Sequence, residues 1–271
     1  AGSALPEFEK TLSTDFGAEV IPKADVDSIN GWVSDQTKGK IEKLVENLDP
    51  ESRLVLLNAL YFKADWVDQF DKDLTEPGDF TLSDGKKIKV PMMSDQRKVG
   101  LVVQDDYRAL ALPYQGGNFV WIAVLPNEDK AEKFLTGGLS EEEWATLVEQ
   151  GASPGGREVR IQIPRFELED NQNLSGPFQA IGLEEAFTRK ANFSKMSEEP
   201  LMISQIQHAV KITVNESGSE AAAATAVVMK SRGIALPPQP FILNRPFLFA
   251  IAEAKTGSLV VVGRVSTLDG E

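Results

Sequence analysis

The segment Leu54–Phe62 constrains the fold more than any other part of the sequence. It is an almost continuous apolar run that is interrupted by Asn58. A strand with one face in water would alternate apolar and polar residues, so a continuous run predicts a strand that is buried on both faces. We therefore expect Leu54–Phe62 to be a central strand of a sheet.

The segments around this strand predict an α+β fold. Helical spacing is found at Leu5–Leu12 and Asp25–Val45, with Asp25 as the expected cap and a short strand, Ala18–Pro22, between the two helices. A further helix is expected at Ser140–Gln150, where Ser140 and Glu143 form a capping box. The other expected strands are Phe80–Leu82, Lys87–Met92, Leu101–Val103, Ala109–Leu112, Phe119–Leu125, Val159–Leu168, Ile206–Val214, Pro246–Ala252 and Ser258–Val265.

Composition excludes several classes of protein and partner. With 271 residues, of which 42% are hydrophobic, the chain is expected to form one domain with a sizeable core. The 28 basic and 41 acidic residues give a net charge of −13, which argues against nucleic acid and anionic membranes as partners. The longest apolar stretches, such as Phe119–Leu125, are too short to span a bilayer.

The sequence offers little for catalysis or for cofactor binding. His208 is the single histidine, there is no cysteine, and no Gly-x-Ser-x-Gly elbow accompanies a serine. No glycine-rich phosphate loop and no clustered metal ligands are present, so we expect no metal and no cofactor. A buried, hydrogen-bonded histidine is the favoured interpretation of His208, and a catalytic base is the alternative.

The segment from Asn215 to Ile234 has the character of a protease bait. It passes through a run of small residues and ends at Lys230, Ser231, Arg232 and Gly233. A basic residue among small ones in an exposed loop is a preferred cleavage site for trypsin-like proteases. A plain surface loop and an alanine-rich helix are the simpler interpretations.

The same segment also has the pattern of a strand. Ser219, Ala221, Ala223, Thr225 and Val227 would share one face, and all are small or β-branched. Glu220 falls on the opposite face, where it would stay in water. The segment is therefore compatible with both a loop and a strand, as a conformational switch requires.

This segment resembles the hinge and reactive loop of inhibitory serpins. The family pattern of an acidic residue, a glycine, a Ser/Thr, a glutamate and a run of alanines is matched by Glu216, Gly218, Ser219, Glu220, Ala221, Ala222, Ala223 and Ala224. The resemblance implies a reactive-centre loop at 216–240 with a hinge at 216–226. It also implies a scissile bond between Arg232, which lies 16 residues after Glu216, and Gly233.

Other motifs extend the resemblance over the whole chain. They are Asn30-Gly-Trp-Val, Thr37-Lys-Gly-Lys-Ile, Leu57-Asn-Ala-Leu-Tyr-Phe-Lys with Trp66, Lys89-Val-Pro-Met-Met, Leu112-Pro-Tyr and Phe241-Ile-Leu-Asn-Arg-Pro-Phe-Leu-Phe-Ala-Ile. The resemblance implies a serpin fold, with a mixed main sheet that carries the reactive loop, a second sheet or barrel, and helices packed around them. Residues 1–271 would be a single serpin domain that matches about the carboxy-terminal two-thirds of the family pattern and lacks its amino-terminal end.

The resemblance also implies roles for residues outside the loop. Asn58 and His208 match the shutter pair, in which the histidine bonds across strands that must part. Arg165 and Glu216 match a basic and acidic pair at the breach, where insertion begins, near Trp66. These are gating roles rather than catalytic ones.

The implied function is inhibition of trypsin-like serine proteases, in which the cleaved loop inserts into the main sheet of a metastable protein. A non-inhibitory serpin acting as a carrier or chaperone, and an inactive fragment, are the alternatives. A companion amino-terminal fragment of the same serpin is an expected partner, and control by glycosaminoglycans is left open. Sequons at Asn173, Asn192 and Asn215 favour an extracellular glycoprotein, while an intracellular location is left open.

Overall fold

The computed structural model describes residues 4–152, 156–219 and 238–270. They form two compact units. The first unit contains the chain up to Tyr61 together with Leu168–Ile212, and the second contains Phe62–Glu167 together with the chain from Thr213 onward. The expectation of a single domain stays a prediction.

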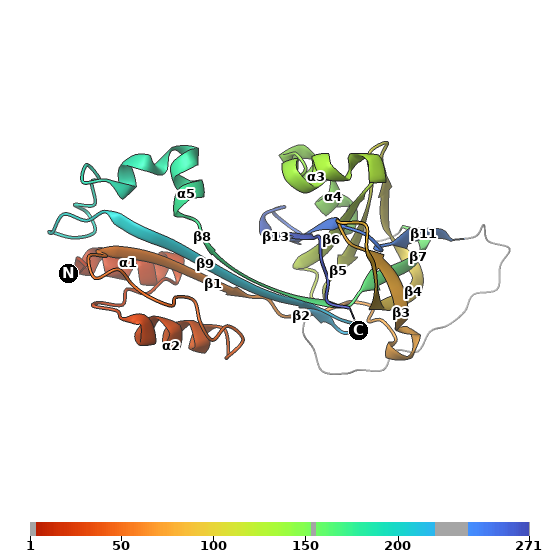
Figure 1. The fold of residues 1–271 in the computed structure, drawn as a ribbon, viewed down its shortest axis with the longest axis horizontal. Coiled ribbons are helices and arrows are strands. Elements are labelled where there is room, and N and C mark those ends of the chain that lie inside the picture. Colours follow the sequence, from red (N-terminus) through yellow and green to blue (C-terminus); the bar gives the residue numbers. More distant parts are fainter. Residues whose placement is uncertain (1–3, 153–155, 220–237, 271) are drawn as a thin grey trace. The chain divides into compact units, whose positions relative to one another are not determined.

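The first unit is built on a three-stranded sheet in the order β1-β9-β8, with β1 (Leu54–Tyr61) and β9 (Ile203–Val214) parallel (Figure 1). Helix α2 (Val26–Gln36) covers one face, because its Ile29 and Val33 are buried in one cluster with Ala209 of β9. The remaining elements that lie wholly or partly in this unit are β8 (Phe166–Asn173), α1 (Pro6–Phe16), α5 (Ser175–Phe178), the π-helical η3 (Gln179–Leu183) and the 3-10 helix η4 (Glu184–Phe187).

The prediction that Leu54–Phe62 is a central strand buried on both faces is wrong for the described chain. Strand β1 pairs with β9 alone among the described strands, so it is an edge strand. Leu57 and Ala59 pack against the α2 cluster, whereas Leu56 is 37% exposed and Asn58 is exposed. One face is therefore covered and the other is open to solvent.

The predicted helix at Asp25–Val45 ends early. Its start is confirmed, since the Asp25 carboxylate accepts a hydrogen bond from the Ser28 N–H at 2.8 Å. The helix ends at Gln36 because Lys38 and Gly39 adopt left-handed backbone angles, with φ of 55° and 74°. The predicted strand Ala18–Pro22 is also wrong, since that segment joins no ladder with the described chain.

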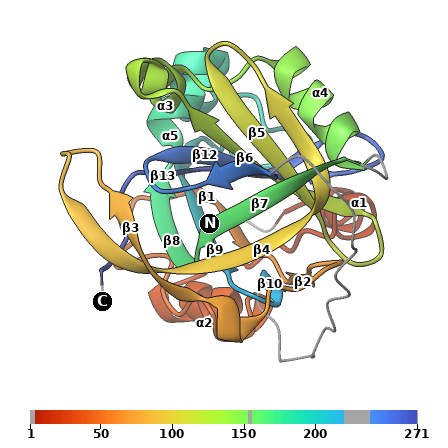
Figure 2. The ribbon, with the colours of Figure 1, turned by 90° about the vertical axis from the view of Figure 1, so that its right-hand side faces the viewer.

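The second unit contains an eight-stranded sheet in the order β11-β7-β4-β5-β6-β12-β13, with β3 paired to β4 (Figure 2). Helices α3 (Ala131–Gly137) and α4 (Glu141–Ala152) pack on β5, β6 and β12 through a cluster that includes Phe134, Trp144 and Ile122. The strands are β3 (Glu76–Thr81), β4 (Lys87–Val103), β5 (Tyr107–Pro113), β6 (Phe119–Pro126), β7 (Arg157–Pro164), β11 (Gln239–Ile242), β12 (Phe247–Glu253) and β13 (Leu259–Val265). The smaller elements are β2 (Ala64–Asp65), β10 (Gly218–Ser219), η1 (Lys72–Leu74) and η2 (Glu128–Lys130).

Two strand predictions in this unit need correction. The expected strands Lys87–Met92 and Leu101–Val103 are one long strand, β4. The expected strand Val159–Leu168 is two strands, β7 and β8, which belong to different sheets and are separated at Arg165. The break follows Pro164, which has no N–H to donate to a ladder.

The α+β class is confirmed by these mixed sheets and packed helices. The capping box of α4 is confirmed too, since Ser140 N–H donates to Glu143 Oε2 at 2.8 Å and Glu143 N–H donates to Ser140 Oγ at 3.3 Å. Among the described helices, none has the length and apolar character needed to cross a membrane.

The loop after α2 is fixed by one side chain. Asn30 Nδ2 donates to Val45 O at 2.8 Å, and Asn30 Oδ1 accepts from the N–H groups of Leu44 and Val45 at 2.8 and 3.1 Å.

We expect Asn30→Ala to lower the free energy of unfolding by about 2 kcal/mol, because three partly buried hydrogen bonds are lost. Urea unfolding measures this loss. Asn47→Ala on the same loop is the matched control and should change stability by less than about 0.5 kcal/mol; equal effects of the two substitutions would contradict the assignment.

Candidate functional site: the start of the hinge

The predicted reactive loop divides at Ser219. Glu216, Gly218 and Ser219 are described and lie in the second unit. The other predicted loop residues lie outside the described residues; these are Glu220, Ala221, Ala222, Ala223, Ala224, Thr225, Lys230, Ser231, Arg232 and Gly233.

A tight turn carries the chain from β9 into the hinge. Asn215 N–H donates to Gly218 O at 2.9 Å, Gly218 N–H donates to Asn215 O at 3.2 Å, and Asn215 Oδ1 accepts from Ser217 N–H at 3.0 Å. After this turn, β10 pairs antiparallel with β2. The turn therefore reverses the chain direction at the point where the hinge begins.

Only glycine fits at position 218. Its φ of 151° lies in the region that favours glycine, and a Cβ atom there would lie 2.2 Å from the carbonyl oxygen of Ala64. This close approach of two backbones explains why the glycine of the hinge pattern is needed at this position.

Trp66 lies directly against the turn. Its indole N–H donates to Asn215 O at 2.9 Å, and its backbone N–H donates to Ser217 O at 2.9 Å. The Trp66 ring stacks on Tyr114 with a centroid distance of 4.6 Å and an interplanar angle of 9°. Trp66 therefore contacts the turn through two hydrogen bonds and contacts Tyr114 through ring stacking.

Tyr114 holds the last described residue of the hinge. The Tyr114 hydroxyl and Ser219 Oγ share a hydrogen bond of 2.7 Å, and both residues are fully buried. Burial raises the pKa of Tyr114 well above its ordinary value, so the phenol is neutral at physiological pH and is able to donate. Sequence reasoning identified Leu112-Pro-Tyr as a motif but gave Tyr114 no role.

Glu216 is buried beside the turn with two side-chain partners. Thr75 Oγ1 donates to Glu216 Oε1 at 2.8 Å, and Arg165 Nη1 lies 3.6 Å from the same oxygen. The Glu216 side chain is 4% exposed and that of Arg165 is 48% exposed. The structure thus brings the predicted breach pair together, but the shorter contact is to Thr75, which the sequence did not indicate.

Asn58 and His208 lie in the first unit, on β1 and β9. They are direct partners in the parallel ladder, and Asn58 Oδ1 lies 2.9 Å from His208 Nδ1. The predicted hydrogen bond across these strands is therefore present. The expected burial is wrong, because His208 is half-buried and Asn58 is exposed on the uncovered face of β1.

The three sequons differ in accessibility. Asn173 and Asn192 are exposed. At Asn215, by contrast, the hydroxyl-bearing Ser217 is buried and the Asn215 side chain accepts a hydrogen bond within the turn. No group of three or more histidine, aspartate or glutamate side chains in the described part of the chain is placed to hold a metal ion.

Comparison with known proteins places this geometry in a family. The model of the family described as "Serpin (serine protease inhibitor)" matches residues 3–268. Iripin-2 of Ixodes ricinus is 33% identical over 97% of this chain and 68% of its own length, and the leukocyte elastase inhibitor of Sus scrofa is 34% identical over 97% and 73%. The crystal structure of human thyroxine-binding globulin is 26% identical, with a TM-score of 0.87 over 100% of this chain and 72% of that one.

The architecture, with a three-stranded sheet and a second sheet packed with helices, agrees with the fold of these matches. They set aside the interpretation of His208 as a catalytic base, because the matched family is one of protease inhibitors rather than enzymes. The chain belongs to the serpin family.

Proposed function

We propose that this chain inhibits trypsin-like serine proteases as a suicide substrate, with cleavage between Arg232 and Gly233. The observation that supports the proposal is the buried start of the predicted hinge: Gly218 and Ser219 follow β9 through a tight turn, in which Asn215 and Gly218 form an antiparallel bridge, and then pair antiparallel with β2. The proposed bait residue, Arg232, lies 16 residues after the buried Glu216.

The turn defines a register for insertion. Asn215 and Gly218 form an antiparallel bridge. Continuing this pairing one residue at a time sets Ser219 opposite Val214 and Thr225 opposite His208. Since His208 already faces Asn58 of β1, the inserted Thr225 would come between these two side chains.

The strand arrangement supplies a driving force for insertion. Strands β1 and β9 are parallel neighbours, and a segment inserted antiparallel between them would give each strand an antiparallel partner. Antiparallel ladders are slightly more stable per residue, and each added hydrogen bond contributes about 0.5–1.5 kcal/mol. In this register Ser219, Ala221, Ala223, Thr225 and Val227 would share the face of Asn58 and His208, and all are small or β-branched, so they would enter the sheet with little obstruction.

Trapping would begin with the ordinary first step of a serine protease. The serine of the protease would attack the carbonyl of Arg232, the Arg232–Gly233 bond would break with Gly233 leaving as the free amine, and the protease would remain bound as an ester. Insertion of the freed hinge before water hydrolyses this ester would carry the protease away from the loop. Inhibition is therefore a competition between insertion and deacylation.

The side chain of Arg232 sets the proposed target class. A trypsin-like specificity pocket holds an aspartate that pairs with arginine, whereas an elastase pocket accepts small residues. Although a relative carries the name elastase inhibitor, the bait of this chain is basic. Lys230 and Met229 are the alternative baits.

A carrier is the second candidate function, because solved structures of thyroxine-binding globulin with thyroxine share this fold. Absence of any covalent complex, with ligand binding instead, would favour the carrier.

Secretion with glycans at the exposed Asn173 and Asn192 stays part of the proposal. A companion amino-terminal segment is proposed as the partner for the edge of β1 that pairs with no described strand.

Arg232→Ala should abolish inhibition of trypsin, because the aspartate in the specificity pocket of trypsin would have no cation to pair with. Mixing each variant with trypsin and looking for a complex that survives a denaturing gel measures this directly. Lys230→Ala is the matched control and should form the complex normally. If Arg232→Ala kept its complex and Lys230→Ala lost it, the bait would be Lys230.

Thr225→Arg should turn the inhibitor into a substrate, because a long cationic side chain placed between Asn58 and His208 would crowd this hydrogen-bonded pair and slow insertion. Trypsin should then cleave the loop without forming a stable complex. Thr225→Ser keeps a small polar side chain and should inhibit normally. A stable complex with Thr225→Arg would contradict the register that places residue 225 opposite His208.

Tyr114→Phe should speed insertion about three- to tenfold, because it removes the hydrogen bond that holds Ser219 before insertion and keeps the stacking on Trp66. Ser219→Ala should have a similar effect, and the double variant should be no faster than either one. Stopped-flow fluorescence of the tryptophans during the reaction with trypsin measures the rate. Additive effects of the two substitutions would show that the bond does not restrain the hinge.

A further inference from the structure

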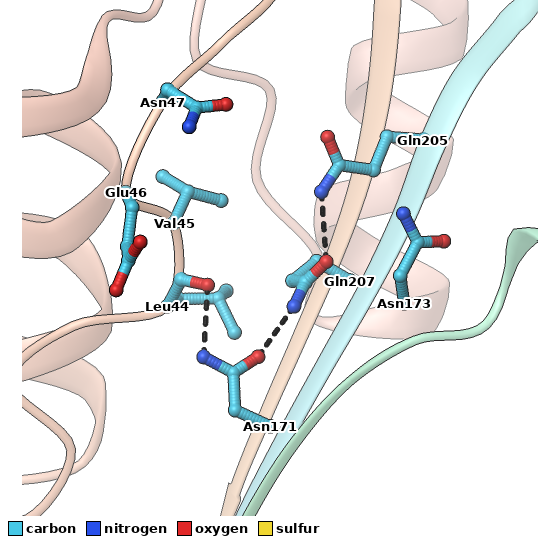
Figure 3. A pocket seen from close by; sticks show the side chains of 8 residues that line it. All are labelled: Leu44, Val45, Glu46, Asn47, Asn171, Asn173, Gln205 and Gln207. Carbon is cyan, nitrogen blue, oxygen red and sulfur yellow. Dashed lines mark hydrogen bonds between the residues drawn. The ribbon is translucent and has the colours of Figure 1, made fainter.

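A polar pocket of about 410 Å³ opens in the first unit between the segment 44–47 and strands β8 and β9 (Figure 3). Its volume lies in the range of about 300–1,000 Å³ that is usual for small-molecule sites. No residue of the hinge, the shutter pair or the breach pair lines it. Its lining residues are Leu44, Val45, Glu46, Asn47, Asn171, Asn173, Gln205 and Gln207.

The lining excludes several kinds of ligand. Five of the eight residues are carboxamides, and the one charged residue, Glu46, is acidic, so phosphates and carboxylates find no cation. Leu44 and Val45 are 1% and 4% exposed and belong to the core of the unit, so the pocket presents little apolar surface. A polar ligand without negative charge therefore fits this lining.

Hydrogen bonds fix the orientation of three of the amides. Gln205 Nε2 donates to Gln207 Oε1 at 2.8 Å, Gln207 Nε2 donates to Asn171 Oδ1, and Asn171 Nδ2 donates to Leu44 O at 3.0 Å (Figure 3). These three hydrogen bonds form a series in which each amide donates to the next group, from β9 through β8 to the segment 44–47. It leaves Gln205 Oε1 as an acceptor at its open end.

Other amide groups around the pocket are also left available. Asn173 Oδ1 accepts from Ser175 N–H at 2.9 Å, so its Nδ2 is the group still able to bond a ligand. The side chain of Asn47 bonds to no residue of the described chain, and it points across the opening toward Gln205 (Figure 3). The pocket thus presents both donors and acceptors, which is what a hydroxyl group requires because it gives and takes a hydrogen bond.

We propose that this pocket binds an uncharged sugar of the N-acetylhexosamine type, whose hydroxyls and acetamide complement the carboxamide lining. Asn173 is also the first residue of an exposed sequon, so the sugar has two possible sources. It is either a free saccharide or the first sugar of a glycan attached to Asn173 Nδ2. In the second case Asn173 Nδ2 is the atom of attachment, and the sugar would bond the remaining amides of the pocket.

The test uses the full chain made in bacteria, which carries no glycan, and N-acetylglucosamine as the probe. Saturation-transfer NMR should give saturable binding that Asn47→Ala and Gln205→Ala each weaken about three- to tenfold. Gln172→Ala is the matched control, because Gln172 is an exposed amide between two lining residues but does not line the pocket. An unchanged urea midpoint verifies that each variant is folded.

Two results would overturn the proposal. One is the absence of saturable binding, and the other is binding that is equal in all three variants or is displaced by inorganic phosphate. A second arm identifies the source of the sugar by making the wild type and Asn173→Gln in a glycosylating host. If only Asn173→Gln binds the free sugar, the chain's own glycan fills the pocket, and if both bind it, the ligand is a free saccharide.

Discussion

The buried hydrogen bond between Tyr114 and Ser219 holds the start of the predicted hinge, just after the turn that follows β9. Around it, Gly218 allows two backbones to approach too closely for any side chain, and Trp66 donates to the carbonyl of the turn. These contacts fix the direction in which the chain leaves β9 and therefore the register in which it would return. In the proposed mechanism they also restrain the hinge until cleavage frees it.

In the proposed function, insertion of the loop and choice of the target protease depend on different residues. Whether insertion occurs depends on the small side chains after Ser219 and on the parallel pair β1 and β9, which gains antiparallel partners. In the proposed mechanism, which protease is trapped would depend on the bait residue, Arg232. A change of bait would therefore redirect the inhibitor without altering its hinge, and a bulky residue in the hinge would disable it without altering its target.

Local signals in the sequence predicted much of the fold, and long-range contacts account for the failures. The caps at Asp25 and Ser140 depend on residues three positions away, so the sequence contains what is needed to identify them. The end of α2 at left-handed Lys38 and the edge position of β1 depend on backbone geometry and on neighbours elsewhere in the chain. Pairs such as Tyr114 with Ser219, or Thr75 with Glu216, join residues more than 100 positions apart, so no spacing rule would find them.

In the proposed mechanism, the segment after Ser219 becomes a strand beside β9 once Arg232 is cleaved. Hydrogen exchange with mass spectrometry, before and after reaction with trypsin, tests it most directly because new ladder hydrogen bonds slow amide exchange. We predict that the amides of residues 221–227 gain strong protection in the trapped complex and that those of β9 stay protected. If these residues exchanged in the complex as fast as in a free peptide, insertion would be contradicted, whatever inhibition was observed.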